Sequence, residues 1–204
     1  NFFPKNELKT IFDYFPLESK IALLFPENAY GYKINLLIDE IANNSDSIII
    51  NRASYKEDLT DVRGAIKELG KYELRRYELI RQKQILKNKE DQKSKKRLKK
   101  LERFQTTNDL DFTHIILPDY GLRLLQVAPL LPYYDVDPEI VQFVGTGVWD
   151  DPVFFSEPSL QKAIFPGVEA NKRESLVQEY NNIYNSKFMR NVSLEEFVNA
   201  RPPD

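Results

Sequence analysis

The stretch Lys20-Ile-Ala-Leu-Leu-Phe-Pro-Glu-Asn-Ala-Tyr-Gly31 decides the fold class. Residues 21–25 form a continuous apolar run that is too short for a helix and is stopped by Pro26, so they predict a strand buried on both faces. Asn28 and its neighbours supply turn and capping chemistry. Apolar residues then recur at helical spacing over residues 30–43. The stretch therefore predicts a strand, a loop and a helix of the kind found in parallel sheets.

The same alternation of strands and helices continues along the chain. Further strands are predicted at residues 47–52, 112–117 and 140–144 and within 164–168. Helices are predicted at residues 2–15, from Asp58 onward, and at 122–131, 158–163 and 172–184, with a short tail helix from Ser193. The predicted fold class is α/β, a doubly wound three-layer parallel sheet of order 2-1-3-4-5.

One segment interrupts this alternation with charge. Residues 70–104 predict an inserted helical hairpin, which we expect to close through an apolar stripe of Leu74, Tyr77, Leu98 and Leu101. Residues 63–103 hold 16 Lys or Arg against 6 Asp or Glu, a net charge of +10, whereas the rest of the chain carries −12. The protein is thus expected to consist of a basic arm, residues 63–103, and an acidic body, which is the rest of the chain.

Composition limits the class of protein further. The 204 residues are 42% hydrophobic, which is enough for a real core. No apolar run approaches the ~20 residues that span a bilayer. The chain has no cysteine, which excludes disulfides, thiolate zinc sites and a cysteine nucleophile. Cysteine usage therefore leaves the compartment open.

The sequence resembles the second lobe of type I periplasmic binding proteins. Residues 22–31 match the opening of that lobe, a hydrophobic strand followed by an acidic residue and a Tyr-Gly pair. Together with three later segments the sequence resembles the branch known as penicillin-binding protein activators. The three segments are Phe112-Thr-His-Ile-Ile-Leu-Pro-Asp-Tyr-Gly121, Ala128-Pro-Leu-Leu-Pro-Tyr-Tyr-Asp135 and Val144-Gly-Thr-Gly-Val-Trp-Asp-Asp-Pro152.

The resemblance implies a domain organisation and two functions. Residues 1–19 would be a lead-in helix crossing between lobes, residues 20–188 a second-lobe-like domain and residues 189–204 a tail, with the first lobe outside this chain. The first function is a non-enzymatic, exported regulator of cell-wall synthesis that contacts a cell-wall synthase. The alternative is a solute-binding receptor of an ABC-type transport system. Both imply a periplasmic protein, with a lipid anchor in its full-length form as a further expectation.

The sequence contains few residue patterns that are typical of catalytic sites. His114, the single histidine, lies inside a predicted strand and is expected to be structural. The pairs Asp109/Asp111 and Asp135/Asp137 are better explained as turn residues than as metal ligands. Ser159-Leu-Gln-Lys162 matches S-x-x-K, but its serine begins a predicted helix and a Lys-Thr-Gly element is absent. Nucleotide-binding glycine motifs are absent too, so we expect no enzyme, no cofactor and no metal.

The loops that follow the strands are the candidate ligand surface, because parallel sheets bind ligands at the carboxyl ends of their strands. Aromatic rings beside hydrogen-bonding groups suit a small polar ligand in an inter-lobe cleft. The alternative is that these rings pack against the other lobe. The candidates are Asn28, Ala29, Tyr30, Ser54, Tyr55, Asp119, Tyr120, Thr146, Trp149 and Asp150.

Two features bear on the ligand and the partner. Tyr30 matches the tyrosine that lines the cleft of amino-acid binders, but Lys56 stands where those binders carry an acid that pairs with the ligand's ammonium. A cation there favours an anionic ligand.

The basic residues 63–103 are either a solvated projection or a surface for an anionic partner. Nucleic acid is not expected, because the segment has little aromatic interleaving and the body is acidic.

Overall fold

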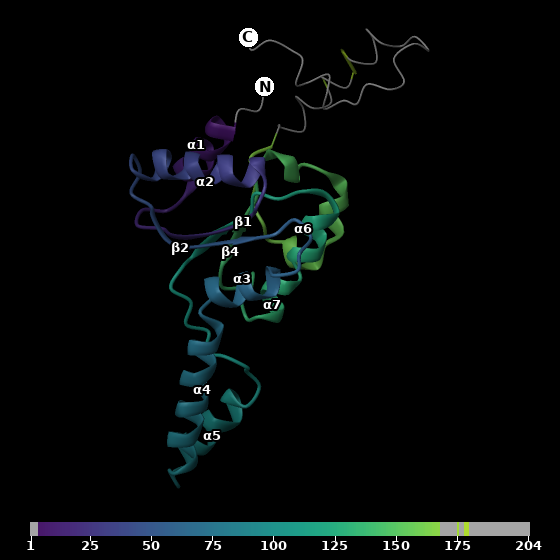
Figure 1. Cartoon of the computed structure of the whole chain (residues 1–204). Helices are drawn as coiled ribbons and strands as arrows, with labels where there is room; N and C mark the ends of the chain where they lie inside the picture. The colour runs from purple at the N-terminus through teal and green to yellow at the C-terminus, as the bar shows by residue number, and fades with distance from the viewer. Residues whose placement is uncertain (1–3, 168–174, 176–177, 180–204) are drawn as a thin grey trace.

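The centre of the molecule is a four-stranded parallel sheet (Figure 1), seen in a computed structural model that describes residues 4–167, 175 and 178–179. Its strands are β1 (Lys20–Pro26), β2 (Ile48–Tyr55), β3 (His114–Ile116) and β4 (Gln142–Val144), in the order β2-β1-β3-β4. All three neighbouring pairs are parallel. The predicted α/β fold is confirmed.

Helices cover both faces of the sheet. α1 (Pro4–Tyr14) and α2 (Ala29–Ala42) lie on one face, and α3 (Val62–Leu69), α6 (Gly121–Val127) and α7 (Leu130–Tyr133) lie on the other (Figure 1). Strand β1 serves both cores, because Ile21 and Leu23 face the first while Ala22 and Leu24 face the second. All four side chains are fully buried. This double burial explains why the run is apolar at every position.

The fifth strand is reduced to a single bridge. Ile164 makes an isolated parallel bridge to Val144 at the β4 edge. Its amide donates to the Phe143 carbonyl at 3.0 Å, and its own carbonyl accepts from Gly145 at 2.8 Å. The fifth position in the predicted order is therefore occupied by this bridge and not by a strand.

Several predicted boundaries are corrected. β2 runs to Tyr55 instead of ending at residue 52, and β3 and β4 are shorter than predicted. The helix predicted at residues 122–131 is divided, because Pro129 has no amide hydrogen to continue α6, and α7 begins after it. Asp58 bonds to Thr60 in the turn before α3 and does not cap that helix.

The chain after β4 forms three short 3-10 helices, η1 (Gly147–Trp149), η2 (Pro152–Ser156) and η3 (Pro158–Leu160). The last of these lies where a helix over 158–163 was predicted. The predicted helix over 172–184 falls almost wholly, and the tail helix wholly, outside the described residues.

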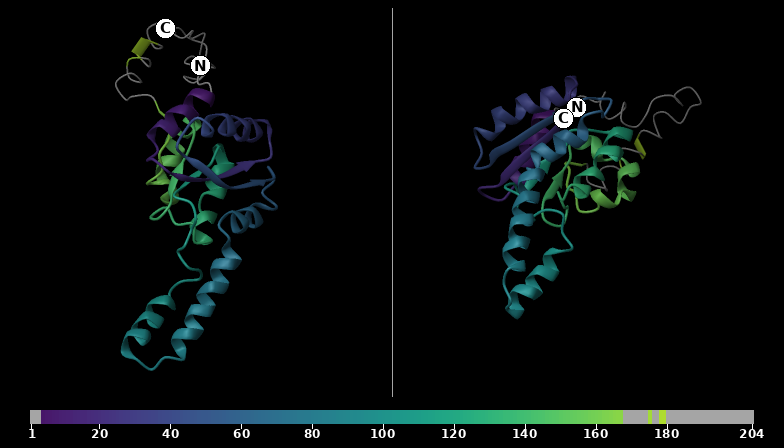
Figure 2. Two further views of the ribbon diagram at one scale, coloured as in Figure 1. Left: turned by 90° about the vertical axis from the view of Figure 1, so that its left-hand side faces the viewer. Right: turned by 60° about the horizontal axis from the view of Figure 1, so that its bottom comes forward.

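The charged segment forms a helical hairpin. α4 (Tyr72–Lys87) and α5 (Gln92–Leu101) pack on each other and extend away from the sheet (Figures 1 and 2). The predicted inner stripe is wrong in α4, because Leu74 and Tyr77 are 65% and 66% exposed. The buried leucines of α4 are Leu79 and Leu86 instead, while Leu98 and Leu101 of α5 are half-buried. In the part of the chain that the structure describes, no helix has the length and apolarity to cross a bilayer.

Arg75 fixes the hairpin to the body. This arginine is only 4% exposed, and its guanidinium is surrounded by backbone carbonyls. Nε donates to the Gly70 carbonyl at 2.6 Å, Nη1 to the Thr107 and Asp135 carbonyls, and Nη2 to the Tyr134 carbonyl. Burial lowers the pKa of Arg75, but a guanidinium stays protonated in proteins. One cation thus joins the root of the hairpin to the segment after α7.

Close backbone contact joins β1 to α2. The Asn28 side chain accepts from the Gly31 amide at 2.8 Å and caps the helix. A Cβ atom at position 31 would stand 2.1 Å from the Pro26 carbonyl oxygen. The strand can therefore turn directly into the helix only if position 31 carries no side chain.

Replacing Gly31 by alanine is expected to lower the free energy of unfolding by about 3 kcal/mol, because backbone atoms must move to admit the methyl group. Urea denaturation followed by circular dichroism measures the change. Gly64→Ala is the matched control: position 64 lies in α3 with open space around it. Alanine there is expected to stabilise by about 0.5–1 kcal/mol. Equal effects of the two substitutions would contradict the packing account.

Arg75→Leu is expected to destabilise the protein by about 2–4 kcal/mol, because it leaves several buried carbonyls without a donor. The neighbouring Arg76 is exposed, so Arg76→Leu is expected to change stability by less than about 0.5 kcal/mol. Chemical denaturation of both variants tests this contrast. A small effect at position 75 would show that the hairpin is not held by this side chain.

Candidate functional site

Asp119 ties together the end of β2 and the segments that follow β3 and β4. Its carboxylate is almost fully buried and accepts from the Tyr55 hydroxyl at 2.5 Å. The Arg123 Nε atom, one turn into α6, donates to both carboxylate oxygens at 2.9 and 2.8 Å. The Asp119 carbonyl accepts from the Trp149 indole at 2.9 Å. We call Tyr55, Asp119, Arg123 and Trp149 the Asp119 cluster.

Electrostatics keep Tyr55 and Arg123 protonated. Burial, followed by the adjacent charge of Asp119, raises the pKa of Tyr55 well above its ordinary value. The hydrogen bond to Asp119 raises the pKa of Arg123. At neutral pH the phenol is therefore a donor, the guanidinium is charged, and both bond to one carboxylate.

Four of the ten predicted ligand residues are buried. Tyr55, Asp119, Thr146 and Trp149 are all exposed by 1% or less. The Trp149 ring lies so close to Gly145 that a Cβ atom there would overlap it at 2.0 Å. These side chains hold the loops together, so the structure does not place them where a ligand could touch them.

The other aromatic candidates form a partly exposed rim above the cluster. The half-buried Tyr30 donates its hydroxyl to Thr146 Oγ1 at 2.8 Å. Its ring meets that of Tyr120 edge to face, with centroids 6.1 Å apart. The Arg123 guanidinium lies 5.7 Å from the centre of the Tyr120 ring, which is 48% exposed as a residue. Burial raises the pKa of Tyr30 to about 12, so its hydroxyl is neutral at physiological pH. We call Tyr30, Tyr120 and Arg123 the rim.

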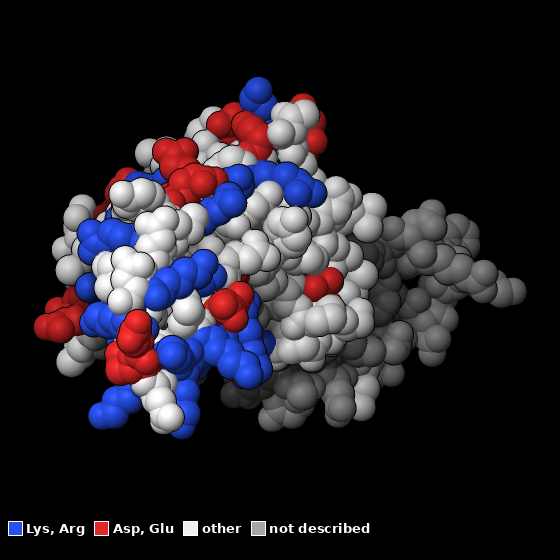
Figure 3. All heavy atoms as spheres, turned by 90° about the horizontal axis from the view of Figure 1, so that it is seen from below, with Lys and Arg blue, Asp and Glu red and all other residues white. Residues whose placement is uncertain are grey.

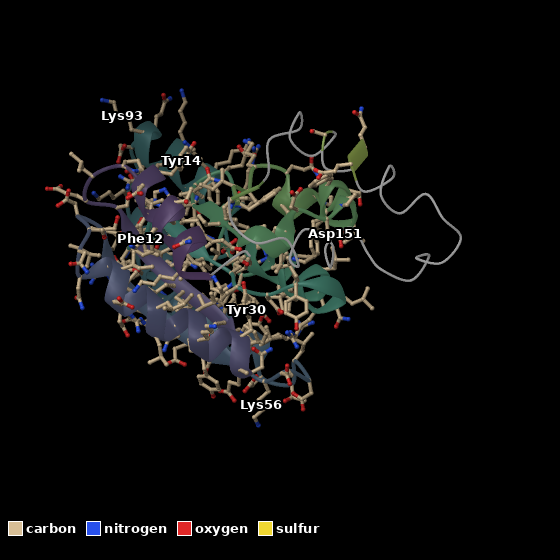
Figure 4. All side chains as sticks on the ribbon, turned by 90° about the horizontal axis from the view of Figure 1, so that it is seen from above. Phe12, Tyr14, Tyr30, Lys56, Lys93 and Asp151 are labelled. Atoms are coloured by element: carbon tan, nitrogen blue, oxygen red, sulfur yellow. The ribbon has the colours of Figure 1, made fainter. Side chains whose placement is uncertain are left out.

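The remaining four candidates lie at or next to the ends of strands and helices. Asn28 caps α2 and donates to Glu57 at 2.8 Å, and Ser54 donates to Glu27 at 2.8 Å. Ala29 is exposed at the start of α2, and Asp150 is half-buried after η1. Figure 4 shows Tyr30 and Lys56 at the same end of the molecule, with the Lys56 side chain directed outward.

Sequence reasoning missed three charged residues of this site, which are Glu7, Glu57 and Arg123. Arg123 binds Asp119 and also donates to Glu57 at 3.1 Å. Its spacing of four residues from Asp119, across a helix start, is a signal that the sequence does carry. Glu7 accepts from the Gly147 amide at 3.0 Å, but it is 140 residues away in the chain, and no local pattern reports such a contact.

The residues considered for catalysis lie elsewhere. His114 begins β3, at the opposite end of that strand from Asp119, and its ring packs 4.5 Å from Phe15, while burial lowers its pKa. Ser159 donates to Glu157 at 2.6 Å, whereas Lys162 pairs with Glu139. Each member of the S-x-x-K match thus bonds to a different carboxylate. The described residues contain no cluster of three or more His, Asp or Glu able to hold a metal ion.

Asp119→Asn is expected to lower the free energy of unfolding by about 2–4 kcal/mol, because Arg123 loses a largely buried counter-charge and the loop ends lose their shared acceptor. Urea titration at neutral pH measures it. Glu57→Gln removes the exposed partner of the same arginine and is expected to cost less than about 1 kcal/mol. A loss at position 57 equal to that at position 119 would contradict the central role of the buried carboxylate.

Comparison with known proteins identifies the fold. No protein-family profile matches the sequence, and no curated protein matches it. Among solved structures, the chain is similar to a substrate-binding periplasmic protein from Ralstonia solanacearum, with a TM-score of 0.56 and 13% sequence identity. The match covers 95% of this chain and 47% of that protein, so the chain spans about half of its length. At this identity the likeness shows the fold alone: this chain is folded like about half of that protein.

Proposed function

We propose that this chain is a non-enzymatic binding protein whose rim, Tyr30, Tyr120 and Arg123, contacts a small polar solute outside the cytoplasm. The observation that carries the proposal is the rim's geometry: two aromatic rings and a guanidinium stand over the carboxyl ends of parallel strands. This is the place where open α/β sheets bind ligands. The similarity in fold to a substrate-binding periplasmic protein supports it.

The charges near the rim favour an organic anion. Lys56 is exposed beside the acidic Glu57, which is already engaged by Asn28 and Arg123. A free ammonium on a ligand would meet Lys56, whereas a carboxylate would be attracted to it. We therefore propose a carboxylate-bearing solute instead of a standard amino acid held through its amino group.

A second half of the binding site completes this proposal. The similar protein is about twice the length of this chain. The rim is a single surface, and small-molecule sites bury most of the surface of the ligand. We propose that another lobe supplies the facing wall and that the complete protein works as a periplasmic solute receptor of a transport system.

A second candidate function is regulation of cell-wall synthesis, with a cell-wall synthase as partner and a lipid anchor in the full-length protein. It rests on the sequence resemblance to penicillin-binding protein activators. The observation that favours it is the burial of Tyr55, Asp119, Thr146 and Trp149, which leaves a shallow rim. A shallow surface suits contact with a protein better than enclosure of a solute.

Thermal unfolding against a panel of small organic acids, amino acids and sugars tests the solute proposal. A carboxylate ligand at 100 times its Kd is expected to raise Tm by about 5 °C or more. Tyr120→Ala is expected to weaken binding by about tenfold or more. Tyr77→Ala removes a similarly exposed tyrosine from the hairpin and should leave Kd unchanged. Absence of any stabilising compound, combined with direct binding of a purified cell-wall synthase, would favour the regulatory candidate instead.

A further inference from the structure

The outer surface of α5 carries an uninterrupted set of cations. Helix α5 reads Gln-Lys-Ser-Lys-Lys-Arg-Leu-Lys-Lys-Leu, with six cations and no acid in ten residues. Ser94 is its buried position, Leu98 and Leu101 are half-buried, and all six cations are exposed. Among the ion pairs of the described residues, none involves a cation of α5. Their charge is thus directed entirely to solvent.

The hairpin holds this charge in a fixed position. Asp91 caps α5 by accepting from the Ser94 amide at 2.8 Å, and the Lys83 side chain donates to the Phe104 carbonyl at 3.2 Å where the chain leaves the hairpin. Arg75 anchors the other end of the hairpin in the body. Figure 3, which views the molecule from below, shows Lys and Arg side chains gathered on the side where the hairpin projects. The surface is therefore presented on a rigid support.

The chemistry of the cations distinguishes between anionic partners. Five of the six are lysines, which are compact point charges and lack the planar fork that pairs bidentately with individual carboxylates. The helix has no aromatic residue, so it offers no stacking platform for bases. A dense, laterally uniform array of negative headgroups matches such a surface best, because it needs charge density and no directional pairing.

The rest of the molecule favours one orientation at such a surface. The residues outside 63–103 carry a net charge of −12. A negatively charged bilayer would repel that body while attracting the hairpin, which extends away from the sheet (Figure 2). The molecule would approach with the hairpin first. The exposed apolar residues Leu74 and Tyr77 lie on the α4 surface and do not interrupt the cations of α5.

We propose that the cationic surface of α5 is a contact site for an anionic phospholipid bilayer. The contact is electrostatic and peripheral: lysine ammonium groups lie among the headgroup phosphates while the helix remains outside the hydrocarbon region. It uses no residue of the rim, so it holds whether or not the chain binds a solute.

Vesicle co-sedimentation with the whole chain tests the proposal. The probes are vesicles of phosphatidylglycerol mixed with phosphatidylcholine, and vesicles of phosphatidylcholine alone, at about 0.03 M and about 0.15 M salt. We expect binding to the anionic vesicles only, weaker at the higher salt. A triple variant on α5 is expected to lower the partition coefficient on the order of 100-fold at low salt, since each lysine near an anionic surface contributes about a fivefold factor. The substitutions are Lys93→Gln, Lys96→Gln and Lys100→Gln.

A matched control removes the same charge from the body. Lysines there are likewise exposed, and glutamine preserves helix propensity at every substituted position except Lys20, which lies at the exposed start of β1. Circular dichroism of each variant verifies that its helices are retained. The control, which should keep most of the binding, carries Lys9→Gln, Lys20→Gln and Lys33→Gln.

Three results would overturn the proposal. The first is equal binding to neutral and anionic vesicles, and the second is equal loss in the two triple variants. The third is tighter binding of duplex DNA or polyglutamate than of anionic vesicles at about 0.15 M salt, with the loss confined to the α5 variant. That outcome would assign the surface to a nucleic acid or to an acidic protein.

Discussion

The buried carboxylate of Asp119 is the constraint on which the candidate site depends. A charge this deep in a protein is tolerated only when hydrogen bonds and a counter-charge replace its lost hydration. Tyr55 and Arg123 supply both, and they come from the end of β2 and from α6. The requirement to satisfy one anion therefore fixes the end of β2 and the start of α6 relative to the loop after β3. The rim follows from it, because the guanidinium that neutralises Asp119 is also the one beside the Tyr120 ring.

The layered fold has a simpler origin than the site. β1 is apolar at consecutive positions and packs into a core on each face of the sheet, which commits the flanking helices to opposite sides. The short step from Pro26 to Gly31 then places the start of α2 directly over the end of the strand. Tyr30 is brought to the carboxyl edge by this step. The position of one rim residue is thus a consequence of backbone geometry near a glycine.

Sequence patterns predicted the sheet because periodicity and strand length are local properties. The order β2-β1-β3-β4 followed from the doubly wound class that the alternation of strands and helices indicates, and the hairpin from the charged break in that alternation. Burial within the loops could not be predicted in the same way: Trp149 and Thr146 look like ligand residues in sequence, and only the packing of distant segments shows that they are enclosed. The predicted inward-facing apolar stripe of α4 was wrong for a related reason. Leu74 and Tyr77 are apolar at helical spacing, but the face that α4 turns inward is chosen by Arg75 and its carbonyl acceptors.

The anchoring of Arg75 also decides how the hairpin can transmit force. A charged arm joined to a domain by a flexible linker would act as a tether, leaving the domain free to tumble after the arm attaches. Here a guanidinium clamps the first turns of α4 to the carbonyls that follow α7. The hairpin is therefore a rigid extension of the domain. Any contact made at its tip fixes the orientation of the sheet and its loops relative to that contact.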